Sequence, residues 1–110
     1  MRCMYEILVP RLWNSGVEIS VECHREWDEK VRAVSGGLTI LHPAKGQWMY
    51  QGKMIGEGVI PCRVIATRED LEKILDITLT HYHDQISVLA YKISDEIILK
   101  YRKEPEHGCA

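Results

Sequence analysis

The chain has 110 residues, of which 45% are hydrophobic and 27% are charged. This length leaves no room for a second core, and the composition excludes a largely disordered chain. The formal net charge of -2 gives no basic excess, and no apolar run could cross a bilayer, so we expect neither a nucleic-acid nor a membrane partner. The apolar N-terminal stretch contains Glu6 and has no cleavage signal, so we expect a cytoplasmic protein.

Four cysteines are spread along the chain without a C-x-x-C pair: Cys3, Cys23, Cys62 and Cys109. In a chain without an export signal, this spacing favours free thiols over a disulfide framework. We expect Cys23 and Cys62 to behave as small buried hydrophobes, because both fall on apolar faces of predicted elements.

The first third of the chain predicts two strands and a helix. Over 5–10, Tyr5, Ile7 and Val9 alternate with Glu6, Leu8 and Pro10, which predicts a strand covered on both faces or on its inner face. Apolar and polar residues alternate over 17–22, which predicts a second, half-buried strand. Apolar residues then recur every three or four positions, which predicts a helix with one apolar face. Those residues are Cys23, Trp27, Val31 and Val34. Ser20 is suited to cap the start of this helix, and Gly36-Gly37 to end it.

The middle of the chain contains β-type runs separated by turn signals. Strands are predicted over residues 38–42, 47–50 and 59–66. Gln51-Gly52 predicts a hairpin turn, and the segment 56–58 (Gly-Glu-Gly) predicts a bulge or a turn. Pro61 has no N–H to donate, so its strand is expected to lie at a sheet edge or to bulge there.

The last third predicts a second helix and two further strands. Thr67 is the expected N-cap, and the apolar face comprises Leu71, Ile74, Leu75, Thr78, Leu79 and Tyr82. Strands are predicted over 86–93 and 97–101, followed by a polar, flexible tail over 102–110.

The order of these elements, without the hairpins, is βαββαβ. We therefore predict one α+β domain over 1–101, a ferredoxin-like sandwich with extra hairpins and two helices on one face of an antiparallel sheet. Each helix is apolar on one face only, so the other face of the sheet requires another cover. Ile65, Leu89 and Tyr91 are expected there, and a second copy of the chain, forming a dimer, would bury them.

Short motifs recur in a fixed order between Trp27 and Leu89. After Trp27 come Gly37-Leu38-Thr39-Ile40-Leu41, Gly46-Gln47-Trp48, Glu57 and Gln85-Ile86-Ser87-Val88-Leu89. This order resembles a family of short bacterial proteins known only as a domain of unknown function. Its members have a Trp in the first helix, a G-L-T-x-L strand, a G-x-W hairpin, an acidic residue and a Q-x-S-V-L strand. The resemblance implies a compact α+β domain and implies no activity.

Several polar or aromatic residues are candidates for a ligand site. Glu57 between two glycines is a candidate general base or ligand acceptor, or else an exposed loop acid; His42 is a second candidate base. Trp48 with Gln47 and Thr39 offers an aromatic plate beside amide and hydroxyl groups, which suits a planar ligand. Alternatively, Trp48 closes the core against the first helix.

The remaining candidates are charged or imidazole side chains. Arg63 interrupts an apolar strand, where it is suited either to bind an anion or to protect an edge strand from aggregation. His81 and His83 do not share a helix face, so a structural role is favoured over a metal site. The sequence contains no phosphate loop, dinucleotide fingerprint or nucleophile elbow. We therefore predict no metal site and no cofactor.

Two classes of function fit these observations. The first is a small homo-oligomeric binding module for a small molecule or a protein, of the kind a phage-type inhibitor or ligand-sequestering protein would be. The second is a small enzyme of the dimeric ferredoxin-like type, an isomerase or a monooxygenase, with Glu57 or His42 as the base and Arg63 as the anion holder.

Overall fold

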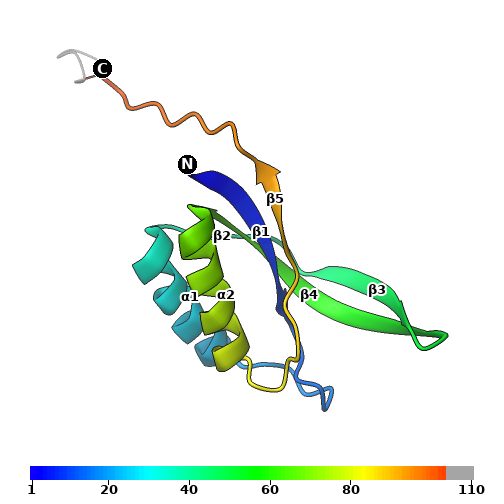
Figure 1. Ribbon diagram of the computed structural model, residues 1–110. Helices are drawn as coiled ribbons and strands as arrows, with labels where there is room; N and C mark the ends of the chain where they lie inside the picture. Colours follow the sequence, from blue (N-terminus) through cyan, green and yellow to red (C-terminus); the bar gives the residue numbers. More distant parts are fainter. Residues whose placement is uncertain (104–110) are drawn as a thin grey trace, which may run out of the picture.

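The structure, a computed structural model, describes residues 1–103 (Figure 1). The predicted tail over 102–110 therefore falls, from residue 104 onward, outside the described residues. The described part contains five strands and two helices: β1 (Cys3–Pro10), α1 (Val21–Ser35), β2 (Thr39–Ile40), β3 (Ala44–Tyr50), β4 (Lys53–Ala66), α2 (Arg68–His81) and β5 (Ala90–Ser94).

The strands form one antiparallel sheet in the order β2-β4-β1-β5, and β3 pairs with β4 as a hairpin extension. Without β3 this is the βαββαβ connectivity of a ferredoxin-like sandwich. Both helices cover the same face of the sheet (Figure 1). The predicted fold class, including the one-sided helix layer and the extra hairpin, is confirmed. We call the face opposite the helices the open face.

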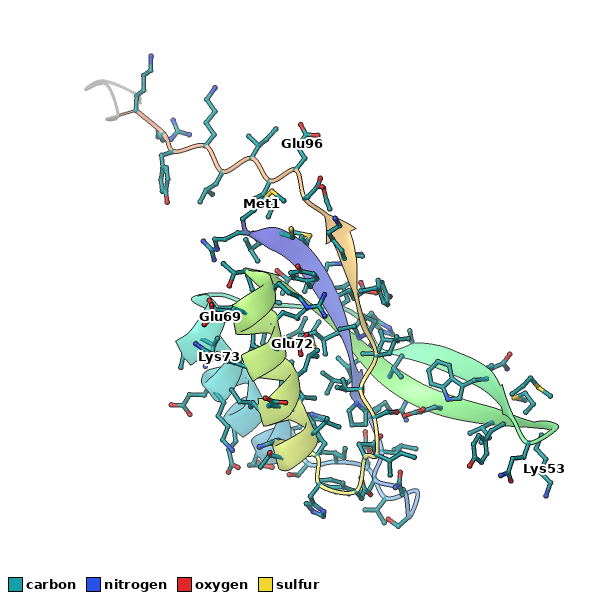
Figure 2. The ribbon with its side chains drawn as sticks, in the orientation of Figure 1. Met1, Lys53, Glu69, Glu72, Lys73 and Glu96 are labelled. Atoms are coloured by element: carbon teal, nitrogen blue, oxygen red, sulfur yellow. The ribbon has the colours of Figure 1, made fainter. Side chains whose placement is uncertain are left out.

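The helices begin and end where their capping residues predict. The Ser20 side chain accepts a hydrogen bond from the Cys23 N–H, and Gly36 ends α1 in the left-handed conformation with φ 82°, which costs glycine little because it has no Cβ. Thr67 caps α2 by accepting from the Asp70 N–H. On α2, charged side chains such as Glu69, Glu72 and Lys73 lie along the helix (Figure 2).

The core lies between the helices and the alternate residues of β1 and β4 that face them. The two helices meet through a buried hydrogen bond of 3.0 Å from the Trp27 indole N–H to the Thr78 hydroxyl. The largest fully buried side chains are Trp27, Tyr82, Ile7, Ile74, Val9, Val31, Val64 and Cys62. Of the two cysteines expected to be buried, Cys62 is buried and Cys23 is half-buried.

The strand predicted over 17–22 is wrong. Within this segment only Glu18 forms a bridge, to Leu12, and Val17 is exposed. The helix begins at Val21 because the Ser20 cap satisfies a backbone N–H of the first turn. At this point of the chain, the helix-capping residue Ser20 predicts the structure better than the short alternation over 17–22 does.

The bulge or turn predicted at residues 56–58 is also wrong, because β4 pairs with β3 in unbroken register through both glycines. Pro61 neither bulges nor lies on an outer strand, since its register with Leu8 of β1 is regular. Its carbonyl accepts from the Leu41 N–H. Pro61 thus directs its missing donor toward the break between β2 and β3, where the ladder on that side of β4 is interrupted.

The C-terminal strands are shorter than predicted. Of the segment 86–93, only residues 90–93 lie in β5 (Ala90–Ser94), which pairs with β1, and residues 97–101 form no strand within the described chain. The chain leaves the edge of the sheet after β5 and extends away from it (Figure 1). A β-type sequence needs a neighbouring strand, and this segment has none among residues 1–103.

The β3–β4 arm, residues 44–59, also projects away from the helices (Figure 1), and Lys53 lies at its tip (Figure 2). Gln51 and Gly52 both have positive φ, 51° and 75°, as a two-residue hairpin turn of the predicted kind requires. The radius of gyration is 17.1 Å, whereas a compact domain of about 110 residues has about 13 Å. The β3–β4 arm and the chain after β5 both project from the sandwich, and together they account for this larger radius.

Candidate functional site

A groove of about 770 Å³ lies at the base of the β3–β4 arm. Its walls are the arm, the segment 85–89 before β5, and the turn after β1. This volume lies within the range of ligand-binding pockets, roughly 300–1,000 Å³. Apolar side chains line most of it, and Glu57, Asn14, Gln85 and Ser87 supply polar groups.

The arm places Trp48 over its own backbone. A Cβ built at Gly46 would lie 2.9 Å from Cη2 of the Trp48 indole, so the ring occupies the space that a side chain at position 46 would need. Glu57 lies directly across from Gly46, and Ile55 directly across from Trp48. Directly opposed residues share one face of a hairpin. The glycine of the G-x-W motif thus allows an indole to lie beside a carboxylate.

The opposite wall of the groove is fixed by a polar clamp between two loops. The Asn14 backbone N–H donates to Oδ2 of Asp84 at 2.7 Å, and the Asn14 amide donates to the Asp84 carbonyl at 2.6 Å. The hydrogen bond from the Asn14 N–H holds the pKa of Asp84 below its usual value. Gln85 donates to both residues. The segment that leads into β5 is therefore held against the turn after β1.

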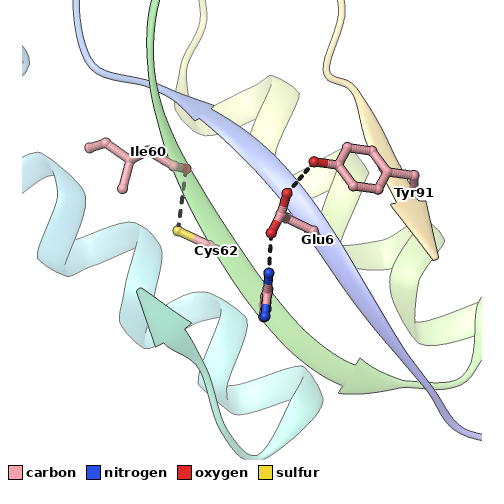
Figure 3. A network of polar contacts seen from close by, with 5 residues as sticks. Glu6, Ile60, Cys62 and Tyr91 are labelled. Carbon is pink, nitrogen blue, oxygen red and sulfur yellow. Dashed lines mark hydrogen bonds and ion pairs between the residues drawn. The ribbon is translucent and has the colours of Figure 1, made fainter. Parts of the chain in front are cut away.

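A second polar cluster crosses the open face. Thr39, Arg63, Glu6 and Tyr91 are opposite one another on β2, β4, β1 and β5, so they form one row, which we call the sheet-face row. Nε of Arg63 donates to Oε1 of Glu6 at 2.9 Å, and the Tyr91 hydroxyl donates to Oε2. Figure 3 shows Glu6 and Tyr91 reaching toward each other from neighbouring strands.

The charges in this row perturb each other's titration. Glu6 is only 7% exposed, yet its pKa is lowered, chiefly by the Tyr91 hydrogen bond and then by Arg63. The same hydrogen bond raises the pKa of Tyr91. Glu6 is therefore held as a carboxylate, and Tyr91 as a neutral phenol.

The predicted ligand residues thus fall into two groups. Trp48 and Glu57 lie together at the groove, whereas Thr39 and Arg63 lie together in the sheet-face row. Glu57 and Arg63 are six positions apart in β4, which corresponds to about 20 Å of extended strand. The predicted residues do not form one site.

Two further candidates lie apart from both groups. Gln47 is next to Trp48 in β3, and successive strand residues face opposite ways, so Gln47 lies on the other face of the arm. His42 is exposed in the connection before β3, with Nδ1 3.0 Å from the Pro43 carbonyl. The alternative roles considered for Trp48 and Arg63 are both wrong: Trp48 is outside the core, and Arg63 is on an inner strand.

The imidazoles near the end of α2 point in different directions. Nε2 of His81 is 2.7 Å from the Cys23 carbonyl, Nδ1 is 3.2 Å from Nζ of Lys30, and His83 stacks on Trp13. Among residues 1–103, no group of three or more His, Cys, Asp or Glu side chains is arranged to hold a metal ion. Neither of the two described helices is long and apolar enough to span a membrane.

The sequence did not predict the roles of Glu6 and Tyr91. The available signal was a charge at position 6 between apolar residues of one strand, together with Arg63 in another apolar strand. Pairing β1 with β4 brings these opposite charges together, but strand register cannot be read from either strand alone.

No protein-family model and no curated protein matches the chain by sequence. Among solved structures, it is similar to the periplasmic divalent cation tolerance protein CutA from Archaeoglobus fulgidus, with 18% identity over 91% of this chain and 89% of that chain, at a TM-score of 0.65. It is also similar to the divalent cation tolerance protein from Thermus thermophilus, with 15% identity over 88% of each chain, at a TM-score of 0.64.

A third similar structure is a phage SAM lyase in complex with S-methyl-5′-thioadenosine, with 13% identity over 96% of this chain and 93% of that chain, at a TM-score of 0.61. At these identities the likeness shows the fold alone. The chain therefore has the ferredoxin-like fold of the CutA proteins, with both helices and the sheet in the same arrangement.

Proposed function

We propose that this protein is a small homo-oligomeric module that binds a small planar ligand in the groove. The observation that carries the proposal is the Trp48 indole, which lies over Gly46 and beside Glu57 at the edge of a groove of about 770 Å³. An aromatic plate offers stacking to a planar ring, and a carboxylate accepts hydrogen bonds from hydroxyl or amino groups.

A nucleoside combines these two features, since it has a planar base and a sugar with hydroxyl groups. Stacking of a base on an aromatic side chain contributes about 1–3 kcal/mol. The similarity to a protein solved with S-methyl-5′-thioadenosine supports the choice of this compound as the first probe. In this arrangement Trp48 stacks on the base and Glu57 accepts from the sugar hydroxyls.

The homo-oligomer is supported by the β3–β4 arm, which is apolar on both faces. Trp48, Tyr50 and Ile55 lie on one face, and Met49 and Met54 on the other; these side chains are 39% to 68% exposed. Contiguous exposed apolar side chains of this kind mark interaction surfaces in soluble proteins. A second copy of the chain, packed against the arm, would cover it.

Titration calorimetry with S-methyl-5′-thioadenosine tests the ligand class. We expect saturable binding that Trp48→Ala weakens roughly tenfold or more and that Glu57→Gln also weakens. Gln47→Ala is the matched control, because this side chain lies on the other face of the same strand, and it should bind as the unmodified protein does. Equal affinity in all four proteins would refute the assignment of the groove.

Native mass spectrometry of the protein purified from its expressing cells tests the rest of the proposal. An oligomer carrying additional small-molecule mass would support it and would identify the ligand class directly. A bare monomer that also fails to bind the nucleoside in the calorimeter would overturn it.

A second candidate is an enzyme. The likeness to the phage SAM lyase extends over nearly the whole of both chains, and Glu57 provides a carboxylate in the groove wall. Incubation with S-adenosylmethionine, followed by chromatography for S-methyl-5′-thioadenosine, tests it. Product formation that Glu57→Gln abolishes would favour the enzyme; binding without turnover would leave the binding module as the function.

A further inference from the structure

In the sheet-face row, Arg63 is about 20 Å along β4 from Glu57, and Leu8 of the groove lining lies between them. The row contains a charge whose position needs an explanation. Glu6 is 7% exposed on the side of the sheet that no helix covers. Burying a carboxylate is costly unless it is paired and hydrogen-bonded. Both Glu6 oxygens are paired, one with Nε of Arg63 and the other with the Tyr91 hydroxyl.

This pairing fixes the orientation of Arg63. The bond to Glu6 uses only Nε, and a guanidinium has five N–H donors in a rigid, planar fork. Among residues 1–103, the two terminal nitrogens of Arg63 have no hydrogen-bond partner, and the side chain is 37% exposed. Glu6 thus holds one edge of the guanidinium and leaves the other edge directed away from it.

The free edge of the guanidinium has the geometry that a carboxylate binds. Two parallel N–H groups match the two oxygens of one carboxylate, and such bidentate, charge-assisted pairs are among the stronger hydrogen bonds. Glu6 and Arg63 together carry no net charge, so a bound monoanion would be left with a single excess negative charge, which favours a monoanion over a dianion.

The surroundings of Arg63 are apolar. Its neighbours on the same face of β4 are Pro61 and Ile65, and the corresponding residues of β1 are Leu8 and Met4. Ile65, Leu8 and Met4 are half-buried, so they leave apolar surface beside the guanidinium. A ligand that uses both features has a carboxylate group and a short apolar body.

We propose that the outward edge of Arg63, held in place by Glu6 and Tyr91, binds the carboxylate of a small amphipathic acid on the open face. Arg63 contacts the ligand, and Glu6 is a positioning residue that acts through Arg63. The Thr39 hydroxyl, next to Arg63 in the row, is a further donor on the β2 side. This site borders the groove at Leu8, but it uses neither Trp48 nor Glu57 and does not depend on the proposed function.

The test uses hexanoate as the probe, with 1-hexanol as the uncharged control, and observes the Arg63 Nε–H resonance by NMR. We expect hexanoate to shift this resonance saturably and hexanol to leave it in place. Arg63→Lys keeps the charge but removes the fork, and we expect it to weaken hexanoate binding roughly tenfold. Arg68→Lys, on the exposed surface of α2, is the matched control and should bind hexanoate normally.

Glu6→Gln tests the positioning role. We expect weaker hexanoate binding together with a displaced and broadened Arg63 Nε–H resonance in the unliganded protein, a signature that a merely structural role would not produce. If this variant does not fold, Tyr91→Phe, which removes one hydroxyl at a half-exposed position, provides the same readout with a smaller effect.

Several outcomes would overturn the proposal. One is a hexanoate response that Arg63→Lys leaves unchanged, and another is no response of the Arg63 resonance at saturating hexanoate. A third is an Arg63 resonance that moves with protein concentration alone, which would show that a second copy of the chain supplies the carboxylate. Loss of the hexanoate response in Trp48→Ala would assign the binding to the groove instead.

Discussion

The contact that joins the two helices offers a direct test of how the core is held together. Trp27 is 1% exposed and Thr78 is 2% exposed, and the indole N–H of Trp27 donates to the Thr78 hydroxyl at 3.0 Å. Thr78→Val keeps the shape of the side chain and removes the acceptor. The buried indole N–H then has no partner, which costs about 1–3 kcal/mol of unfolding free energy.

For a domain of this size, each kcal/mol lowers the melting temperature by about 4–8 °C. The assay is thermal unfolding followed by circular dichroism at one fixed protein concentration, because association would otherwise contribute to the apparent stability. Thr80→Val is the matched control, since Thr80 lies on the same helix and is exposed, and it should change stability by less than about 0.5 kcal/mol.

A double-mutant cycle separates the hydrogen bond from the effect of the valine itself. In a Trp27→Phe background the indole N–H is already absent, so Thr78→Val should cost much less there than in the unmodified protein. An equal cost in both backgrounds, or a Thr78→Val variant as stable as Thr80→Val, would refute the reasoning.

Three further predictions concern single residues. Burial raises the pKa of the Cys62 thiol to about 12, so peptide mapping after alkylation should find this cysteine labelled only in unfolded protein. Nδ1 of His24 lies 2.7 Å from the Tyr82 hydroxyl, and burial lowers the pKa of His24 in the folded protein. As pH falls below about 6.5, the pKa of His in the unfolded chain, the unfolded chain binds a proton before the folded protein does, so the free energy of unfolding decreases. The melting temperature should therefore fall from neutral toward acidic pH, and fall less in His24→Gln. Gly46→Ala should shift the Trp48 indole NMR signal, because the added methyl would lie 2.9 Å from the ring, while stability changes little since the ring is partly exposed and can move.

The elements with strong local signals were predicted correctly. The caps of both helices, the hairpin turn at Gln51-Gly52 and the alternation of β1 each depend on residues adjacent in sequence. The strand predicted over 17–22 failed because alternation over so few residues competes poorly with a helix cap. The strand predicted over 97–101 failed because a strand requires a neighbour, which no local pattern reveals.

The candidate site residues divide in the same way, into those fixed by nearby residues and those fixed by a distant strand. Trp48 and Glu57 could be selected together from sequence because a tight hairpin fixes which residues of β3 and β4 are opposed. Arg63 could be selected as an unusual charge, but its partner Glu6 is 57 positions away. That pairing depends on the register between β1 and β4, which the fold as a whole determines. Sequence patterns therefore identified single residues of the sheet-face row, but they could not predict that these residues lie side by side.

Strand β4 connects the two sites, and its geometry determines how they are related. Its first half, with β3, forms one wall of the groove, and its second half lies between β1 and β2 and holds Arg63. Residues about 20 Å apart along a strand share no side-chain contacts, and substitutions separated by more than about 10 Å usually have additive effects. Trp48→Ala and Arg63→Lys combined should therefore reduce nucleoside and hexanoate binding by the same factors as each variant alone. A combined loss that departs from this product, measured by calorimetry with both probes, would show that an association between copies of the chain links the arm of one copy to the open face of another.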